Sequence, residues 1–320
     1  MDSATVKELA RSAGFDLCGI SAPDRDDRAR RKYLDWLEAG YHGSMAWLAR
    51  EPERRTDPSQ VLPGVKSIIM LGLNYFQPNS QDVPAGKGRV CRYARGRDYH
   101  KVTARKIKAL IRALRREVRS GDRPSFRWSV DFGPFQERTY AERAGLGFIG
   151  KNGLLINERL GSWFFLSEIL TSLELKPDMR NPREHGSCST CSLCLEACPT
   201  GAIVTPRTID ARRCIAYLTI ERPPDISDEL AQSFGMSIFG CDICQEVCPY
   251  NDAASITRHP EFLPPQGLGE FVDIDAILSL RTREEFLELT AGTALTRPRL
   301  EGLKRNAEIV RKNQSSGGRL

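Results

Sequence analysis

The sequence lacks a long apolar run and a recognisable leader. None of its apolar stretches approaches the roughly 18 residues that a membrane-spanning helix needs. Residues 1–8 also lack the basic and then apolar pattern of a secretory signal. No internal repeat occurs beyond two short cysteine runs. These absences argue against a membrane or exported protein. They predict a soluble, cytoplasmic chain, which we expect to be a monomer.

Cysteine, by contrast, is abundant. The ten cysteines include a run from Cys188 to Cys198 with the spacing C-x2-C-x2-C-x3-C, followed by proline. A shorter run from Cys241 to Cys248 has the spacing C-x2-C-x3-C and is also followed by proline. The first spacing is typical of bacterial ferredoxins, in which three thiolates hold one [4Fe–4S] cluster and the fourth cysteine ligates a second cluster. Cys214 can supply the ligand that the shorter run lacks.

The spacing therefore predicts two [4Fe–4S] clusters with four thiolate ligands each. The ligands expected for the first cluster are Cys188, Cys191, Cys194 and Cys248. The ligands expected for the second cluster are Cys198, Cys214, Cys241 and Cys244. A zinc site would use paired knuckles rather than this spacing, and a disulfide framework is typical of short secreted chains. Eight reduced thiolates also fit a reducing cytoplasm.

Positive charge is concentrated in one stretch of the chain. The net charge is +6, but residues 87–119 contain 13 Lys or Arg and only two acids, Asp98 and Glu117. This stretch therefore carries +11 and the rest of the chain −5. Such asymmetry indicates an anionic partner, with nucleic acid as the leading candidate. The alternative is a solvated helix face, because basic faces are common.

Length and apolar periodicity predict an α+β fold of about two domains and a tail. We expect an N-terminal α/β domain with a mixed sheet over residues 1–180, a bacterial ferredoxin-like domain with two clusters over residues 181–255, and a short helical segment over residues 256–320. Apolar runs predict strands at residues 15–20, 65–73, 126–131 and 163–170. Helical patterns occur at residues 28–38, 44–50, 134–144, 275–290 and 299–312, and prolines predict a loop at residues 51–58. A further basic helix is predicted by the spacing of Ile107, Leu110, Ile111, Leu114 and Val118.

Residues 145–152 fit two phosphate-binding patterns only superficially. They satisfy G-x-G-x-x-G, but they follow a helix and precede a strand, which reverses the dinucleotide-binding context. The pattern G-x4-G-K-[ST] fails because Asn152 stands where a metal-binding hydroxyl is required. We interpret the stretch as a helix C-cap glycine followed by a tight turn.

Several motifs taken together resemble those of the epoxyqueuosine reductases, and the resemblance covers nearly the whole chain. The motifs are residues 13–16 (AGFD), 92–100 (RYARGRDYH), 130–138 (VDFGPFQER), 141–152 (AERAGLGFIGKN), 292–295 (GTAL) and 303–306 (LKRN), together with the eight cysteines. Members of this family are cobalamin and iron–sulfur enzymes of the last step of queuosine synthesis in tRNA. The chain departs from longer members in that it ends soon after residue 306, without room for their C-terminal helical repeats.

The resemblance implies that the first domain binds cobalamin with its lower base displaced, and the sequence has no Asp-x-His-x-x-Gly motif for a histidine ligand. It implies that cob(I)alamin reduces epoxyqueuosine to queuosine, with electrons from an external low-potential donor relayed through the two clusters. Opening an epoxide generates an alkoxide, which needs a positioned acid. By resemblance this acid is Asp131, at the end of a strand. The alternative is that Asp131 caps the helix expected near Pro134.

The resemblance also places Tyr99, His100 and Arg138 in the catalytic pocket. It implies cofactor contacts at Arg54, Ala94, Asp131, Asn157 and Thr219. The implied partner is the anticodon stem-loop of tRNA carrying epoxyqueuosine, which presents phosphates and an extruded wobble nucleotide to a basic surface. Residues 87–119 and 297–312 are the candidate contacts. From the residues alone, Tyr99 fits a core position, His100 a structural hydrogen bond, and Arg138 an ion pair with Glu142.

Three other hypotheses remain open. A corrinoid reductive dehalogenase shares the cofactor plan, but it would not need the basic surface and would be expected to carry an export signal. An electron-carrying ferredoxin needs only the cluster domain, which leaves residues 1–180 unexplained. The third hypothesis is a structural iron–sulfur protein that binds RNA without catalysis. In such a protein, substitution of Asp131 would have no catalytic effect.

Overall fold

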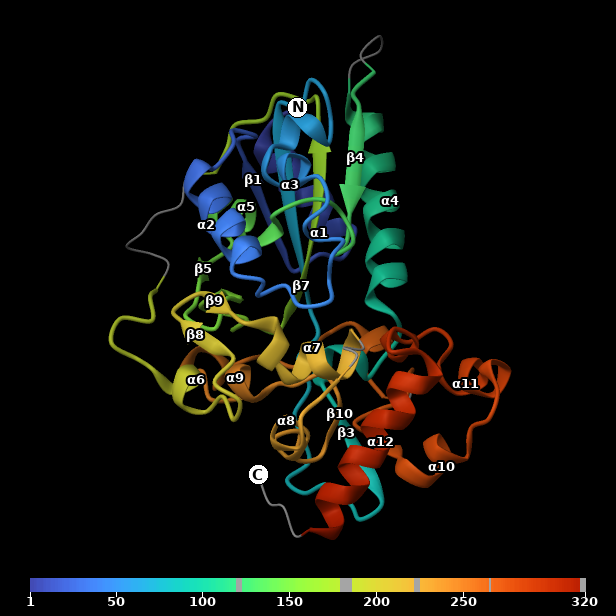
Figure 1. Cartoon of the computed structure of the whole chain (residues 1–320). Coiled ribbons are helices and arrows are strands. Elements are labelled where there is room, and N and C mark those ends of the chain that lie inside the picture. The colour runs from blue at the N-terminus through green and yellow to red at the C-terminus, as the bar shows by residue number, and fades with distance from the viewer. Residues whose placement is uncertain (119–122, 179–185, 222–224, 265, 317–320) are drawn as a thin grey trace.

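The computed structural model describes residues 1–118, 123–178, 186–221, 225–264 and 266–316. Its largest sheet has four strands in the order β1-β2-β7-β4. These strands are β1 (Leu17–Ser21), β2 (Ser67–Asn74), β7 (Phe164–Thr171) and β4 (Phe126–Ser129). Each neighbouring pair is antiparallel. The sheet occupies the upper half of the molecule in Figure 1, between α2 (Asp27–Glu38) on the left and α4 (Tyr99–Glu117) on the right.

Helices cover both faces of this sheet. Alternate residues of β2 enter different cores, since successive side chains of a strand point to opposite faces. Ile69 and Leu71 pack with α1 (Ser3–Ser12) and α4 (Tyr99–Glu117). Ile68 and Met70 pack with α5 (Glu137–Arg143) on the other face. All eight residues of β2 are buried, which explains why this strand is a continuous apolar run.

A three-stranded sheet joins segments that are far apart in the sequence. Strand β3 (Lys87–Val90) lies between β10 (Ser237–Phe239), to which it is parallel, and β11 (Phe271–Asp273), to which it is antiparallel. The last helix, α12 (Arg299–Ser315), contributes Leu303 and other apolar residues to the core beside this sheet. The three parts predicted from the sequence, residues 1–180, 181–255 and 256–320, thus each contribute one strand to this sheet. The exact domain boundaries stay a prediction, and the one between residues 180 and 181 lies outside the described residues.

The cysteine-rich segment consists of short elements, drawn in yellow and orange in Figure 1. They are α6 (Leu193–Glu196), β8 (Ile203–Thr205), β9 (Thr208–Ile209), α7 (Ile215–Ile220), α8 (Asp228–Gln232) and α9 (Ile243–Glu246). Helix α7 belongs to an insertion between Cys214 and Cys241 and reaches the N-terminal part of the chain. The Tyr217 hydroxyl donates to Ser44 Oγ at 2.7 Å and accepts from the Ser44 amide at 2.6 Å.

The α+β class predicted from the sequence is confirmed. The mixed sheet expected within residues 1–180 is not observed there, because the four-stranded sheet is antiparallel throughout. Parallel and antiparallel pairing occur together in the three-stranded sheet, which joins all three predicted ranges. Gly145, with φ 73°, follows α5 and precedes the hairpin of β5 (Phe148–Ile149) and β6 (Leu155–Ile156), as expected for a C-cap glycine. No helix within the described ranges is long and apolar enough to cross a membrane.

Several local predictions were wrong. Residues 44–50 form turns instead of a helix. The loop expected at residues 51–58 contains α3 (Pro52–Thr56), because Pro52 is compatible with a first helical turn. The helix expected from residue 134 begins at Glu137. Residues 275–290 form two helices, α10 (Ile274–Ser279) and α11 (Arg283–Thr290), because Thr282 starts a new helix with a capping box.

Candidate active site and cluster sites

A cavity of about 490 Å³ lies between one edge of the four-stranded sheet and the cysteine-rich segment. Because β2 and β4 both run antiparallel to β7, the end of β2 meets the start of β7, and β4 ends opposite Glu168 and points towards the same end of the sheet. Tyr75 follows β2, Asp131 follows β4, and Phe165 lies at the start of β7, and all three line the cavity. The antiparallel topology thus brings together residues from three separate stretches of the sequence.

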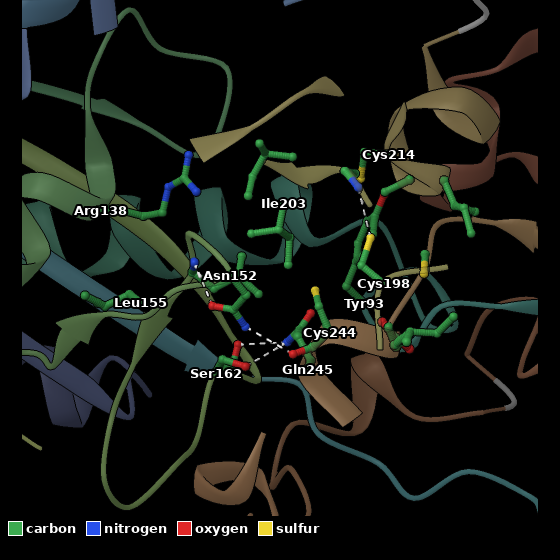
Figure 2. A pocket seen from close by; sticks show the side chains of 18 of the residues that line it. Tyr93, Arg138, Asn152, Leu155, Ser162, Cys198, Ile203, Cys214, Cys244 and Gln245 are labelled. Carbon is green, nitrogen blue, oxygen red and sulfur yellow. Dashed lines mark hydrogen bonds between the residues drawn. The ribbon is translucent and has the colours of Figure 1, made fainter. Parts of the chain in front are cut away.

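Four cysteines of the cysteine-rich segment line the same cavity. They are Cys198, Cys214, Cys241 and Cys244, the set expected to hold the second cluster. Figure 2 shows Cys198, Cys214 and Cys244 gathered on one side of the cavity and Arg138 across from them. Burial raises the pKa of the Cys198 thiol, but hydrogen bonds from Thr200 and from the Ala202 amide outweigh it, so the pKa lies below its ordinary value. This environment suits a thiolate ligand.

The other four cysteines meet at a second, smaller cavity of about 20 Å³. They are Cys188, Cys191, Cys194 and Cys248, the set expected to hold the first cluster. Lys151 spans this site: its amide donates to Cys188 Sγ at 3.3 Å, and its ammonium group donates to the carbonyl of Cys191 at 2.7 Å. Four thiolates around one site are the donor set of a [4Fe–4S] cluster. Asn152 lines both cavities, so the two cysteine sets are neighbours.

Each cysteine run contributes its last member to the other set. Cys198 ends the first run and faces the large cavity, whereas Cys248 ends the second run and faces the small one. The short helices α6 and α9 lie beside each other. Cys198 follows α6 and Cys248 follows α9, so each cysteine lies close to the set formed mainly by the other run. In the sequence, a proline directly follows each of these two exchanged cysteines. The assignment of each cysteine as a cluster ligand stays a prediction that this geometry supports.

Asp131 lies in the loop between β4 and α5 and faces the large cavity. Its Oδ2 accepts a hydrogen bond from the Tyr99 hydroxyl at 2.5 Å. The backbone of Asp131 has φ 61°, a left-handed conformation that is uncommon for a residue other than glycine. The alternative that Asp131 caps the following helix is wrong, because Gln136 is the N-cap and α5 begins at Glu137. A carboxyl group that faces a cavity from a strained backbone position is a candidate catalytic group.

Tyr99 and His100 begin α4 and lie next to Asp131. The Tyr99 ring stacks on Phe165, with 4.3 Å between the ring centroids. Burial and the negative charge of Asp131 raise the pKa of the Tyr99 hydroxyl well above its ordinary value, so this group remains a hydrogen-bond donor. His100 Nε2 lies 3.9 Å from Asp131 Oδ2, and its Nδ1 lies 2.8 Å from Asp98 Oδ1. The structure thus brings three of the four predicted catalytic residues together.

The fourth, Arg138, lines the cavity from α5 and donates to the carbonyl of Gly153. Arg54, Ala94, Asn157 and Thr219 lie outside the lining of the cavity. The side chains of Asn157 and Thr219 are bonded to backbone groups, and Ala94 is packed in the core beside β3. Arg54 differs, since its buried Nε has no hydrogen-bond partner among the described residues. Cofactor contact at these four residues stays a prediction.

Two acidic residues near Asp131 were missed by the sequence analysis. Glu168 lies on β7 and is only 1% exposed, and Glu137 is the first residue of α5. Burial, together with the charge of Asp131, raises the pKa of Glu137 to about 7. Burial, together with the charge of Glu137, raises the pKa of Glu168 well above its ordinary value. The available signal was an acidic residue inside the apolar run 163–170, which a buried strand does not carry without a reason.

Comparison with known proteins identifies both parts of the chain. Residues 55–131 match the family model described as epoxyqueuosine reductase QueG, DUF1730. Residues 187–251 match a 4Fe-4S double cluster binding domain. The epoxyqueuosine reductase of Leadbetterella byssophila is 40% identical over 310 residues, which cover 97% of this chain and 98% of the relative. The epoxyqueuosine reductase of Escherichia coli is 40% identical over 298 residues, which cover 91% of this chain and 76% of the relative.

Solved structures agree with these matches. A crystal structure of epoxyqueuosine reductase with an epoxyqueuosine-modified stem loop of tRNA-Tyr has a TM-score of 0.87 and 29% identity, and the match covers 97% of this chain and 80% of that one. Epoxyqueuosine reductase from Bacillus subtilis, in a structure whose catalytic aspartate loop is swung out of the active site, has a TM-score of 0.85 and 29% identity, with 98% and 82% covered. The family indicated by the sequence motifs is confirmed. The chain is an oxidoreductase and belongs to the epoxyqueuosine reductase family.

Proposed function

We propose that this chain reduces epoxyqueuosine to queuosine in the anticodon stem-loop of tRNA, using cobalamin in the large cavity and electrons relayed through two [4Fe–4S] clusters. The observation that carries the proposal is that Asp131 and the second cysteine set line one cavity. The reaction consumes two electrons and two protons and releases the epoxide oxygen as water. An electron source and a proton source at the same cavity are what this reaction requires. We place the enzyme in the cytoplasm, where thiolates stay reduced.

The walls of the cavity suit a corrin ring. Corrin is a broad, flat and largely apolar macrocycle with amide side chains at its rim. Tyr75, Tyr93 and Phe165 offer aromatic surface, while Asn152 and Gln245 offer amide groups. When bound in its reduced form, cobalamin supplies a strong nucleophile of low potential.

Asp131 and the residues around it supply the two protons that the reaction consumes. As the epoxide opens, negative charge develops on its oxygen, and Asp131 donates a proton to that oxygen. The Tyr99 hydroxyl fixes the orientation of the Asp131 carboxyl through its 2.5 Å hydrogen bond. Release of the oxygen as water takes a second proton. His100, held by Asp98 and 3.9 Å from Asp131 Oδ2, is placed to pass this proton on. The relative from Bacillus subtilis also has its catalytic aspartate on a loop, which supports the assignment of Asp131.

Electrons enter most directly at the first cysteine set. Its binding loop is exposed at Ser189 and Thr190, so an external low-potential donor can approach it. The second set lies next to the first, with Asn152 lining both sites, and opens into the large cavity. With clusters bound, the first cysteine set would hold the one nearer to the donor and the second set the one nearer to the cofactor.

Helix α4 is our candidate for the tRNA contact. Its first residue, Tyr99, lines the cavity, so bound tRNA on this helix would lie beside the active site. Its exposed basic residues are Lys101, Arg105, Lys108, Arg112, Arg115 and Arg116. Not all of the basic stretch is available, because Arg92 and Arg95 are buried and ion-paired with acids of the C-terminal half. The relative in complex with a modified tRNA stem loop supports a nucleic-acid partner.

The basic residues near the C-terminus are weaker candidates, because several bond to the chain itself. Arg297 pairs with Glu221 at 2.8 Å, and Lys312 pairs with Asp228 at 3.3 Å. Lys304 donates to the carbonyl of Leu280.

Charge reversal on α4 is expected to weaken tRNA binding. Arg105→Glu with Arg112→Glu removes two exposed positive charges from one face of the helix. The loss of two phosphate contacts should reduce affinity at least about tenfold near 0.1 M salt and make the salt dependence shallower by about 1.5 in log–log slope. Filter binding at several salt concentrations measures both quantities. Arg28→Glu with Lys32→Glu on α2 (Asp27–Glu38), at the opposite side of Figure 1, is the matched control and should bind like the wild type. Equal effects of the two double variants would contradict the assignment.

The proposed reaction is tested by mass spectrometric nucleoside analysis of tRNA. The purified protein is incubated without oxygen with cobalamin, a strong reductant and tRNA carrying epoxyqueuosine. Conversion to queuosine is expected, and it should stop when cobalamin is left out. tRNA without the modification serves as the control substrate. Absence of conversion by protein that retains both clusters would refute the proposed function.

A further inference from the structure

The most exposed aromatic side chain among the described residues is the one next to Asp131. Phe132 is 63% exposed. It lies outside the lining of the large cavity, although Asp131 faces that cavity. The proposed cofactor contacts therefore leave this ring unexplained. A single exposed apolar side chain would need no explanation, but Phe132 belongs to a larger aromatic surface.

Phe132 ends a row of three aromatic rings along the edge of the main sheet. The other two, Phe126 and Trp128, lie on β4, which is the edge strand. They share one face of β4, because alternate residues of a strand point the same way. Both are only partly buried, against the core to which α4 also contributes. The Trp128 and Phe132 rings meet edge to face, with 6.3 Å between their centroids. This aromatic row therefore leads along β4 to the loop that carries Asp131.

Basic side chains of α4 lie over the two strand residues of the aromatic row. The Arg115 guanidinium carbon is 5.5 Å from the centroid of the Phe126 ring, and the Lys108 ammonium nitrogen is 5.9 Å from that of the Trp128 ring. Helix α4 and strand β4 lie side by side in Figure 1. The sequence has no acidic residue between positions 99 and 116, so no acid on this part of the helix offsets the positive charge.

The aromatic row and the basic side chains beside it converge on the cavity. The His100 and Phe132 rings lie 6.1 Å apart between their centroids. His100, Lys108 and Arg115 follow one another at intervals of eight and seven residues, so they occupy one stripe of α4. At a rise of 1.5 Å per residue, this stripe is about 22 Å long. Flat aromatic rings and positive charge thus lie together along a line that ends beside Asp131.

We propose that the aromatic row is a stacking platform for unpaired bases of the anticodon loop, and that Phe132 stacks on the base next to the nucleotide that enters the cavity. This inference rests on the proposed function, in which an extruded nucleotide reaches Asp131. Extrusion leaves the neighbouring base without its stacking partner, and an exposed aromatic ring can replace that partner.

The chemistry of the surface favours single-stranded RNA over a duplex. Proteins bind single strands by combining a positively charged surface, which follows the phosphates, with aromatic rings on which the bases stack. The stripe on α4 supplies the first feature and the aromatic row supplies the second. In a duplex the bases are paired and stacked on each other, so their faces are closed to the rings.

The test compares two RNA probes in the full-length protein with both clusters. One is a hairpin made of the anticodon stem and its single-stranded loop, and the other is a blunt duplex of the same stem. Phe132→Ala should weaken hairpin binding at least about fivefold, which is the lower end of the effect of losing one stacked base. Duplex binding should stay within about twofold of the wild type. Leu287→Ala, at an exposed apolar position on α11, is the matched control and should bind both probes like the wild type.

Two further variants and the salt dependence separate stacking from other contacts. Phe132→Leu keeps an apolar side chain without an aromatic face and should bind the hairpin as weakly as Phe132→Ala, whereas Phe132→Trp should bind at least as tightly as the wild type. In Phe132→Trp, the added tryptophan emission should fall when the hairpin binds and stay constant with the duplex. Because a neutral ring releases no counterions, Phe132→Ala should leave the log–log salt slope unchanged, unlike the charge reversal on α4.

Neither probe carries epoxyqueuosine, so the outcome does not depend on turnover. Wild-type hairpin affinity of Phe132→Ala, or an equal loss of hairpin and duplex binding, would overturn the proposal. Wild-type affinity of Phe132→Leu would replace stacking by a plain apolar contact and would overturn it as well. In each of these cases the wild type still binds the hairpin, and the proposed function stands. A wild type that binds neither probe would instead refute the tRNA assignment on which the proposed function depends.

Discussion

Replacement of Asp131 by asparagine is expected to lower turnover about 1,000-fold, which is within the range that general acid catalysis contributes. Asparagine is nearly isosteric with aspartate, and its carbonyl oxygen can still accept the hydrogen bond from Tyr99. It has no acidic proton to donate to the oxygen of the opening epoxide. The backbone bond from residue 131 to Glu137 is also retained. Single-turnover conversion of epoxyqueuosine tRNA at saturating enzyme measures the effect on chemistry separately from binding.

The interpretation requires that the rest of the enzyme is intact. Iron content and tRNA affinity of Asp131→Asn should equal those of the wild type, since Asp131 is not an expected cluster ligand and is not one of the exposed basic residues of α4. Asp82→Asn, at an exposed loop position, is the matched control and should have wild-type activity. A variant at position 131 that keeps more than about a tenth of the wild-type rate would exclude Asp131 as the acid and favour His100 in that role.

The parts of the site that depend on local spacing could be predicted from the sequence. The two cysteine runs fix their own geometry over a few residues, and the grouping predicted from them coincides with the two sets that line separate cavities. The strands of the main sheet could be predicted because both of its faces are covered, which makes β2 a continuous apolar run. The family motif around residue 131 indicated the acid that we propose, although its contact with Tyr99 depends on the antiparallel sheet topology.

The parts that depend on distant partners could not be predicted. Arg92 appeared to belong to a basic surface, yet it is buried against Asp242 and Glu246, about 150 residues further along the chain. The same pairing of distant segments places β3 between β10 and β11, and nothing in the sequence near residue 87 specifies these neighbours. Glu168 was overlooked because a single acid does not disturb the apolar pattern of a strand.

Replacement of Cys244 by alanine is expected to remove the second cluster alone and to lower turnover at least about 100-fold, because the cofactor then loses its adjacent electron donor. Iron content should fall from about eight to about four atoms per chain. Electron paramagnetic resonance of the reduced protein should still show the remaining [4Fe–4S] cluster. Cys18→Ala is the control, since this half-buried cysteine lies outside both sets and should leave iron content unchanged.

Double variants test whether the two runs exchange their last cysteines. Cys198 belongs to the first run by sequence, but it shares a cavity with Cys244. Cys198→Ala with Cys244→Ala should therefore remove one cluster and leave about half of the iron. Cys188→Ala with Cys198→Ala removes one ligand from each set and should leave almost none. If ligands were grouped by run, the two results would be reversed, because Cys188 and Cys198 would then hold one cluster. The iron content of these two proteins thus decides between grouping by sequence and grouping by the cavity that the thiolates share.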